Sequence, residues 1–249
     1  MYCLHPILVK KYKELPDGSH KRTADTHRVP CGKCVACLSR RRNEWTYRLT
    51  AEQKSCNYSF FVTLTYSDEN VPIRVVDEKP YFVFRKSDVQ KYIKRVRYFL
   101  SKFDISCNYY LVSEYGAHTH RPHYHALFFV YDKNNHYNQV ANLFRKEWNF
   151  GYCVVKITNP ANIHYVTKYC VKSLQEHFND VIDDVFTLSS KASYLGKGFE
   201  DKLEIQVSDN VRSPLVYFNG YQQAMPRIYR EKLGVGGVPV KESPLYPRS

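Results

Sequence analysis

A ten-residue segment, Arg121 to Val130, constrains the fold of this chain more than any other part of the sequence. It begins Arg-Pro-His-Tyr-His and continues as an apolar run, which is the pattern of a buried β-strand. Side chains on a strand alternate between the two faces of a sheet, so His123 and His125 point the same way and Tyr124 points the other way. Two imidazoles on one strand face can share a metal ion. The segment therefore predicts a central strand with a metal-binding face.

The spacing of this histidine pair is by itself a weak signal, because ten histidines in 249 residues produce about 0.4 such pairs by chance. A second pair, His118 and His120, lies in the predicted turn just upstream, where exposed histidine is ordinary. Glu114 ends the strand before that turn, and a hairpin of the two strands would bring its carboxylate close to His123 and His125. These three side chains would suit a divalent ion with open coordination positions. The alternative is that Glu114 is an ordinary surface residue at a strand end.

The rest of the hydrophobic pattern alternates between helices and strands, which predicts an α+β domain. Helical periodicity is expected up to about residue 54, at 87–103 with Ser87 as N-cap, at 138–148, and after an N-cap at Asn159 followed by Pro160. Runs of β-branched and aromatic residues predict strands at 58–66, 108–115 and 152–158, with a short hairpin within 73–85.

These elements suggest three segments. Residues 1–54 form a cysteine-rich segment with a basic helix, 55–173 form the core, and 174–249 form an extension packed on the core, loose from residue 234 onward. No glycine-rich phosphate loop followed by Lys-Ser/Thr occurs, which excludes a nucleotide-hydrolysing motor of that type. No apolar run approaches the length of a membrane span and no signal-peptide pattern occurs, so we expect a soluble, cytoplasmic protein.

A cysteine cluster near the N-terminus predicts a structural metal site. Cys31, Cys34 and Cys37 form two Cys-x2-Cys spacings in a row, which suits a tetrahedral zinc site. The fourth ligand must come from elsewhere, with Cys3 as the best candidate and His5 as the next. An iron–sulfur cluster uses similar spacings, but its usual fourth cysteine before a proline is absent. Zinc is therefore preferred over iron–sulfur, and either is preferred over free thiols.

Charge and aromatic content point to a nucleic-acid partner. The chain carries 37 basic and 24 acidic residues, a net charge of +13, and this excess fits a polyanion. Aromatic residues make up 15% of the chain, and rings on which bases stack favour single strands. The charge alone also fits a merely soluble basic protein. Arg40, Arg41 and Arg42 lie on the predicted basic helix, where they either contact phosphates or face solvent.

The last predicted helix carries Tyr165 and Tyr169, which are four residues apart and therefore share a helix face. Each is followed three residues later by a lysine, Lys168 or Lys172. The tyrosine spacing alone is uninformative, since 22 tyrosines produce about two such pairs by chance. The repeated Tyr-x2-Lys unit is more informative and indicates a shared role for the two tyrosines.

Three motifs now stand in order along the chain. They are Phe-Val-Thr-Leu-Thr-Tyr, Arg-Pro-His-Tyr-His-Ala-Leu-Phe-Phe and Tyr-Val-Thr-Lys-Tyr-Cys-Val-Lys. Their order resembles that of the HUH endonucleases that start rolling-circle replication, which combine such a strand with a His-hydrophobic-His motif and a helix bearing one or two nucleophilic tyrosines. With the cysteine cluster and the segment from Met225 to Tyr229, the chain resembles in particular the replication initiators of the small single-stranded DNA phages (Microviridae), gokushovirus branch.

The resemblance implies a compact α+β domain of ferredoxin-like core, in which a central antiparallel sheet has helices packed on one face and the metal on the other. It implies a metal-dependent transesterification, with Mg²⁺ or Mn²⁺ held by Glu114 and the histidine pair. One of the two tyrosines would attack the scissile phosphate, helped by Lys168 or Lys172. The products would be a 5′-phosphotyrosine and a free 3′-hydroxyl that primes a polymerase. Two tyrosines could alternate over a replication round; the plainer alternative is one nucleophile and one structural tyrosine.

The same resemblance implies the partners of the chain. They would be single-stranded DNA at the viral origin, contacted by Arg121 and the three arginines of the basic helix, and the host helicase and polymerase, in the cytoplasm of the host bacterium. Two other functions stay open. One is a transposase or conjugative relaxase, which shares all three motifs. The other is a non-enzymatic, zinc-containing binder of single-stranded nucleic acid, in which the histidines and tyrosines pack or stack.

Overall fold

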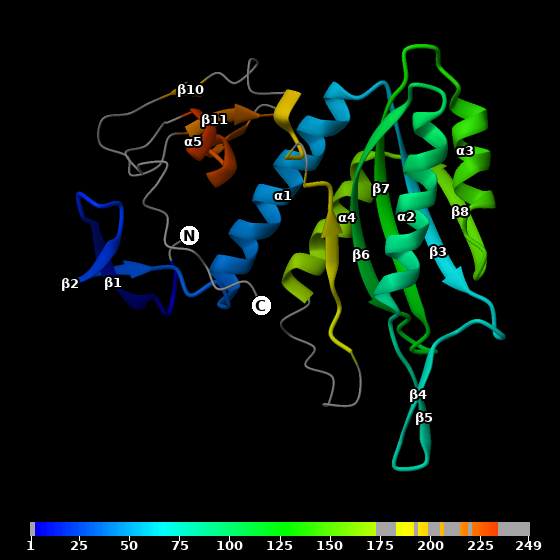
Figure 1. The fold of residues 1–249 in the computed structure, drawn as a ribbon, viewed down its shortest axis with the longest axis horizontal. Helices are drawn as coiled ribbons and strands as arrows, with labels where there is room; N and C mark the ends of the chain where they lie inside the picture. The colour runs from blue at the N-terminus through cyan, green and yellow to red at the C-terminus, as the bar shows by residue number, and fades with distance from the viewer. Residues whose placement is uncertain are drawn as a thin grey trace.

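The computed structural model describes residues 3–172, 183–191, 194–198, 205–206, 215–218 and 221–233. At its centre lies a five-stranded antiparallel sheet with the strand order β8-β3-β7-β6-β9 (Figure 1). These strands are β3 (Tyr58–Tyr66), β6 (Ser106–Tyr115), β7 (Pro122–Tyr131), β8 (Gly151–Ile157) and β9 (Thr187–Ser189). The histidine strand β7 is the middle strand, in keeping with its continuous apolar run.

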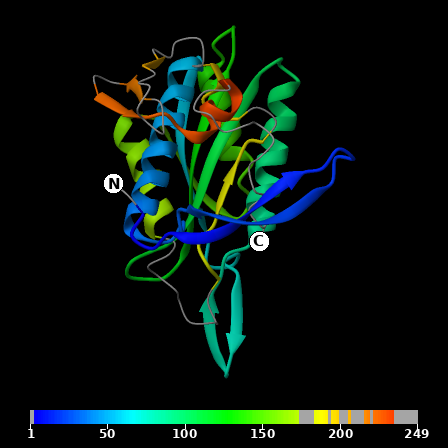
Figure 2. The ribbon, with the colours of Figure 1, turned by 90° about the vertical axis from the view of Figure 1, so that its left-hand side faces the viewer.

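Helices cover both faces of this sheet (Figures 1 and 2). They are α1 (Val35–Ser55) and α4 (Pro160–Lys172) on one face, and α2 (Lys86–Ser101) and α3 (Tyr137–Lys146) on the other. Strand β7 supplies both layers in alternation. Tyr124 and Phe128 are buried in the core with α2 and α3, whereas Leu127 and Phe129 are buried in the core with α1 and α4. Because both faces of β7 are apolar beyond the histidines, both need a covering layer.

The predicted α+β class with a central antiparallel sheet is confirmed, and the predicted placement of the helices needs a correction. Helices were expected on one face only, with the metal ligands on the other. The face that carries His123 and His125 is itself covered by α1 and α4. The histidines share that face with Leu127 and Phe129, which would otherwise be exposed to water.

The boundaries of the predicted elements lie within about two residues of the observed ones, and β3 matches its prediction at both ends. Asn159 is confirmed as a cap of α4, since its Oδ1 accepts the backbone N–H of Asn162 at 2.9 Å. The prediction that Ser87 caps α2 is wrong. That helix starts at Lys86 after Arg85 and has no side-chain cap.

The described parts of the C-terminal segment pack against the core. Strand β9 pairs with β6 at the edge of the central sheet, and α5 (Arg227–Leu233) lies against α1, where Tyr229 meets Tyr47 edge-on at 5.6 Å. Gly196 approaches this contact with φ of +90°, and a Cβ there would collide with the Tyr229 hydroxyl. A small sheet of β10 (Ile205–Gln206), β11 (Leu215–Phe218) and β12 (Tyr221–Ala224) completes this part. The division at residues 54 and 173 stays a prediction, and the predicted loose tail from 234 lies outside the described residues.

Two hairpins project from the body of the molecule (Figure 1). The short hairpin expected within 73–85 is present as β4 (Ile73–Val76) and β5 (Lys79–Phe82). The longer hairpin, β1 (Ile7–Glu14) and β2 (His20–Val29), was not predicted. Its turn is Pro-Asp-Gly-Ser, in which Asp17 accepts the Ser19 N–H at 2.8 Å and Gly18 has φ of +78°. No helix within the described part of the chain is long and apolar enough to cross a membrane.

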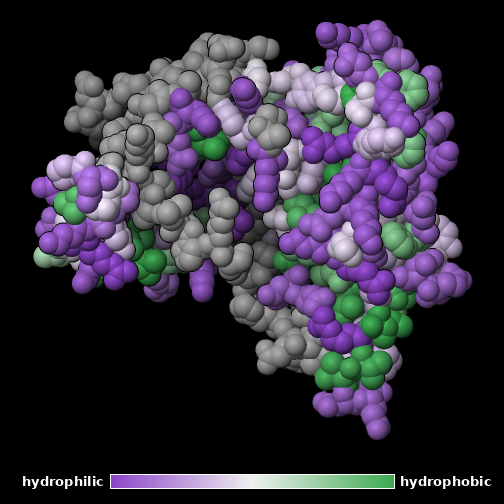
Figure 3. Space-filling model, viewed as in Figure 1, coloured by the Kyte–Doolittle hydropathy of each residue, from purple (hydrophilic) through white to green (hydrophobic). Residues whose placement is uncertain are grey.

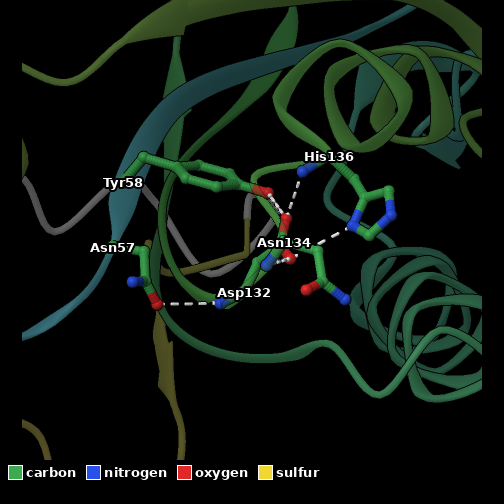
Figure 4. A network of polar contacts seen from close by, with 5 residues as sticks. All are labelled: Asn57, Tyr58, Asp132, Asn134 and His136. Carbon is green, nitrogen blue, oxygen red and sulfur yellow. Dashed lines mark hydrogen bonds and ion pairs between the residues drawn. The ribbon is translucent and has the colours of Figure 1, made fainter.

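A polar network holds the turn from β7 into α3 (Figure 4). The Asp132 carboxylate accepts the Tyr58 hydroxyl at 2.6 Å and the backbone N–H groups of Asn134 and His136 at 3.0 and 2.5 Å. Its other contact is with His136 Nδ1 at 3.1 Å, and its own N–H donates to Asn57 at 2.8 Å. The side chain of Asp132 is 1% exposed, so these donors replace water around a buried charge.

Candidate active site

The two predicted histidines stand side by side on the sheet face toward α4 and are half-buried. Their ring nitrogens Nδ1 meet two threonines of the neighbouring strand β3. Thr63 Oγ1 lies 3.1 Å from His125 Nδ1, and Thr65 Oγ1 lies 3.0 Å from His123 Nδ1. The antiparallel register pairs the same residues across the strands. Each imidazole is therefore oriented through Nδ1, which leaves Nε2 as the nitrogen available to a ligand.

Glu114 joins this strand face to helix α4. Its Oε2 lies 2.9 Å from His125 Nε2 and accepts the Tyr165 hydroxyl at 2.6 Å. The Tyr169 hydroxyl in turn donates to the Tyr165 hydroxyl at 3.2 Å. His123 faces Glu114 in the β6–β7 register. The predicted hairpin thus places Glu114 beside the histidines, and the helix brings both predicted tyrosines to the same place.

The ionisation of these groups follows from their burial and contacts. Burial opposes the charge on Glu114, but hydrogen bonds from His125 and from the two tyrosines outweigh it and lower its pKa to about 2. Burial, followed by the hydrogen bond to Glu114, raises the pKa of Tyr165 to about 12. The same causes raise the pKa of Tyr169 further. Burial and the neighbouring His125 lower the pKa of His123. At neutral pH the carboxylate is charged and both tyrosines are protonated.

The two tyrosines are not equivalent. Tyr169 is 2% exposed and belongs to the core around α4, whereas Tyr165 is only partly buried and touches Glu114 directly. Lys168 makes cation–π contacts with both rings, since its Nζ lies 3.9 Å from the ring centroid of Tyr165 and 5.0 Å from that of Tyr169. The side chain of Lys172 lies outside what the structure describes. The predicted pairing of Lys172 with Tyr169 therefore stays a prediction.

The cysteine cluster comes together as predicted. The Sγ atoms of Cys3, Cys31, Cys34 and Cys37 all lie within 4.8 Å of one another, while His5 is exposed. Backbone N–H donors, led by that of Leu4, lower the pKa of Cys34 to about 6. Burial raises the pKa of Cys37 to about 12. Four thiols this close, with no disulfide among them, suit a tetrahedral metal ion.

The two candidate metal sites differ in how closely their donors gather. Among the described residues, only the cysteine cluster brings three or more ligand atoms within 4.8 Å of one another. In the other set, Glu114 and His125 are in direct contact, but the ligand atoms of Glu114, His123 and His125 do not all lie within 4.8 Å of one another. Two imidazole nitrogens and a carboxylate are nevertheless a chemically suitable set for a divalent ion. An ion there would replace the contact between Glu114 and His125.

The predicted DNA-contacting arginines fall into two groups. Arg40, Arg41 and Arg42 are exposed on the first turns of α1. Arg121 instead pairs with Asp68 and donates to the Tyr66 carbonyl at 2.9 Å. It ties the β6–β7 turn to the end of β3, beside the active-site face.

Sequence reasoning missed three residues of this site, all on β3. Thr63 and Thr65 orient the histidines, and the Phe61 ring lies parallel to that of His125 at 5.7 Å. Their alternation within the first motif places them on one face. Only the pairing of β3 with β7 shows that this face is the one with the histidines.

Comparisons of the sequence with known proteins find phage replication-associated proteins. The family model of the ORF2-type replication-associated proteins matches residues 59–174, from β3 to just beyond α4. The chain is 30% identical over 200 residues to replication-associated protein ORF2 of Spiroplasma virus 4, covering 70% of this chain and 62% of the relative. It is 29% identical to replication-associated protein VP4 of Bdellovibrio phage phiMH2K, covering 93% and 76%.

A third relative, replication-associated protein ORF4 of Chlamydia phage 1, is 22% identical, with 87% of this chain and 56% of the relative covered. The chain thus spans less than two thirds of the length of the first and third relatives. Among solved structures, the N-terminal nuclease domain of minute virus of mice non-structural protein 1 is 10% identical, covers 66% of this chain and 81% of its own, and has a TM-score of 0.26. That score is too low to assign a shared fold.

Proposed function

We propose that this chain, a member of the phage replication-associated protein family, is a rolling-circle replication initiator that nicks and rejoins single-stranded origin DNA through a phosphotyrosine. The hydrogen-bonded chain from His125 through Glu114 to Tyr165 supports this most directly. In it the Tyr165 hydroxyl of α4, the proposed nucleophile, contacts a histidine–carboxylate pair of the sheet.

The reaction would be a transesterification. The Tyr165 hydroxyl gives up its proton to solvent and its oxygen attacks the scissile phosphorus, the bond from phosphorus to the 3′-oxygen breaks, and the leaving 3′-oxygen takes up a proton. The DNA keeps a 5′-phosphotyrosine link, so the strand can be rejoined by the reverse step without another energy source. Tyr165 comes first in this proposal because it is the more exposed of the two tyrosines. Tyr169, one helical turn away, would act in the second cut after a small shift.

The Tyr165 hydroxyl needs activation. Its pKa of about 12 and the Glu114 pKa of about 2 are too far apart for Glu114 to remove the proton unaided. Glu114 therefore orients the hydroxyl, while Lys168 over the ring favours negative charge on the oxygen. A Mg²⁺ or Mn²⁺ ion held by Glu114, His123 and His125 would supply the remaining stabilisation of the tyrosine oxygen and of the scissile phosphate. In the cysteine cluster, the proposed ion is zinc with a structural role.

Covalent capture tests the proposal. The chain is incubated with Mn²⁺ and short single-stranded oligonucleotides that tile the genome encoding it, and adducts resistant to denaturant are mapped by peptide analysis. Wild type should carry DNA on Tyr165 at the first cut. Tyr165→Phe combined with Tyr169→Phe should form no adduct, whereas Tyr152→Phe, an exposed tyrosine on β8, should behave as wild type.

Each other outcome has a definite meaning. Adducts in the double variant would place the nucleophile elsewhere. Binding without any adduct in wild type would favour the non-enzymatic binder. A first cut that survives Tyr165→Phe and is lost in Tyr169→Phe would reverse the proposed order of the tyrosines. Cutting confined to sites outside the phage's own origin would favour a transposase or relaxase.

In the host bacterium the initiator would act with the host helicase and polymerase.

A further inference from the structure

The β1–β2 hairpin has exposed residues along both of its faces. It projects from the foot of α1 and does not join the central sheet (Figures 1 and 2). Of the hairpin residues whose side chains the structure describes, most are exposed and none is fully buried. An isolated two-stranded hairpin is marginal in water. Such a hairpin adds little to the stability of the core, so its length needs another explanation.

The hairpin carries more basic than acidic residues. Residues 7–29 hold six basic and three acidic side chains. Lys13 and Lys21 face each other directly in the register, and like charges placed opposite one another destabilise a hairpin. An anion between or beside the two ammonium groups would remove that repulsion. Lys11, at the register irregularity between Lys10 and Tyr12, is also exposed.

The second projecting hairpin provides a contrast. In β4–β5, Arg74 and Lys79 are balanced by Asp77 and Glu78. Figure 3 shows apolar residues gathered at this lower projection, and mostly hydrophilic ones on the β1–β2 hairpin at the left. Projection from the body therefore does not by itself bring positive charge. Of these two hairpins, only β1–β2 has a basic excess.

We propose that the β1–β2 hairpin is a ribbon that binds the phosphate backbone and major groove of double-stranded DNA beside the site of cleavage; this rests on the proposed action on DNA. The major groove accepts a two-stranded β-ribbon. Eight residues of β1 extend about 27 Å, which spans most of one helical turn of DNA.

Duplex is favoured over single-stranded DNA because the hairpin lacks a stacking surface. Tyr12 is the one aromatic residue of Phe, Tyr or Trp type in residues 7–29. Its hydroxyl accepts Arg22 Nε at 2.8 Å, and the guanidinium carbon lies 5.8 Å from the ring centroid. Proteins that hold single strands combine basic grooves with several free rings. In this proposal the site at α4 binds and cuts single-stranded DNA, and the hairpin binds duplex DNA.

The cysteine cluster lies where such a ribbon needs support. Cys3 precedes β1 and Cys31 follows β2, and the Cys31 N–H lies 3.3 Å from Cys3 Sγ. An ion bound by the four cysteines would therefore close the base of the hairpin and join it to the start of α1. The exposed Arg40, Arg41 and Arg42 begin one turn beyond this junction.

Charge reversal on the hairpin tests the inference. The full chain carrying Lys11→Glu, Lys13→Glu and Lys21→Glu is compared with a control carrying Lys79→Glu, Lys91→Glu and Lys94→Glu, three exposed lysines elsewhere. Fluorescence anisotropy measures affinity for a duplex of about two helical turns and for a single strand of equal length, over a range of salt. Nicking of single-stranded oligonucleotides is measured in parallel. Duplex affinity of the hairpin variant should fall about 10²-fold and its salt slope by about 3.

The control should keep duplex affinity, and both variants should keep single-strand nicking. An equal loss in the control, no loss in the hairpin variant, or a loss confined to single-stranded DNA would overturn the inference. Neutral Lys→Gln replacements at the same three positions repeat the test if charge reversal lowers the melting temperature, and they should weaken duplex binding by a smaller factor. If wild type never nicks but the hairpin variant still loses duplex binding, the proposed nicking function is wrong. The inference that the β1–β2 hairpin binds duplex DNA is then still supported.

Discussion

At the two ends of β7 a carboxylate receives a tyrosine hydroxyl, and the surroundings of the two carboxylates differ. Glu114 lies at the end of β6 that pairs with the start of β7, where it accepts Tyr165 and contacts His125 Nε2. Asp132 follows the last residue of β7, where it accepts Tyr58 and a neighbouring histidine (Figure 4). Burial opposes the charge in both places, yet hydrogen bonds lower the pKa of both groups to about 2.

The difference lies in the other donors. Asp132 also accepts two backbone N–H groups and its side chain is 1% exposed, so the protein satisfies it completely. Glu114 accepts only from side chains and is 18% exposed. Side-chain partners can be exchanged for an ion or a phosphate without unfolding the backbone. The same residue types therefore give a structural site where the backbone closes it, and a candidate functional site where it does not.

Replacing His125 by Ala should produce the largest difference between the two ends. The imidazole is a proposed metal ligand beside Tyr165, the proposed nucleophile, so the proposed single-strand nicking should fall by about 10³-fold. The melting temperature and the affinity for DNA should change little, because phosphate contacts elsewhere supply most of the affinity. Gel assays of nicking, together with thermal unfolding, measure both. If His125→Ala still nicks, the Glu114–His125 end of β7 has no more part in nicking than the Asp132 end.

Replacing Asp132 by Ala should have the opposite effect. It leaves the buried donors of the turn without an acceptor, so the free energy of unfolding should fall by about 3 kcal/mol. Nicking per folded molecule should stay at the wild-type level. Urea unfolding checks the first expectation, with Asp25→Ala on the exposed hairpin as a control that should be near neutral. A stable Asp132→Ala protein that cannot nick would reverse the roles assigned here.

The threonines on β3 should show an intermediate effect. Thr63→Val and Thr65→Val keep the shape of the side chain and remove the hydroxyl that meets His125 or His123. Loss of an orienting partner should weaken metal-dependent nicking by about 10- to 100-fold. A titration of activity against Mn²⁺ should show the loss mainly as a higher metal requirement, and Thr→Ser should restore it. Wild-type metal dependence in both valine variants would show that the hydroxyls do not position the rings.

Removing a tyrosine hydroxyl sharpens the comparison further. Tyr58→Phe deletes one donor to the buried Asp132 and should lower the free energy of unfolding by about 1.5 kcal/mol. Tyr165→Phe deletes the donor to Glu114 and should cost less stability, because that carboxylate is more exposed. Paired urea unfolding curves decide this. A larger loss in Tyr165→Phe than in Tyr58→Phe would mean that Glu114 is the more structural carboxylate.

Acid should lower the free energy of unfolding through Asp132, by a smaller amount than the substitutions above. Its pKa is lowered to about 2 in the folded chain from an ordinary 3.8, so the unfolded chain binds the proton more readily as pH falls. The stability from this group is complete above about pH 5 and disappears between about pH 4 and 2. From pH 6 to pH 3 wild type should lose about 1 kcal/mol more than Asp132→Asn. Equal losses would show that Asp132 is not held ionised by the turn.

Local pattern was enough to predict much of the fold. The alternation around His123 and His125, the run of β3 and the cap at Asn159 depend on residues close in sequence, and each was predicted correctly. The cysteine spacing likewise singled out three of the four cysteines that cluster, and named Cys3, 28 residues before Cys31, as the best candidate for the fourth. Periodicity and spacing are local quantities, so one sequence suffices to read them.

Tertiary structure decided what those local patterns face. The second helical layer, the threonines behind the histidines, and the burial of Tyr169 but not Tyr165 depend on which strands pair and in what register. The sequence does not distinguish the two carboxylates either, because Glu114 and Asp132 both lie near a histidine in the chain. Only the folded chain supplies backbone donors to one and leaves the other to side chains. Long-range pairing is a sum over many weak contacts between distant residues, and no short stretch of sequence contains it.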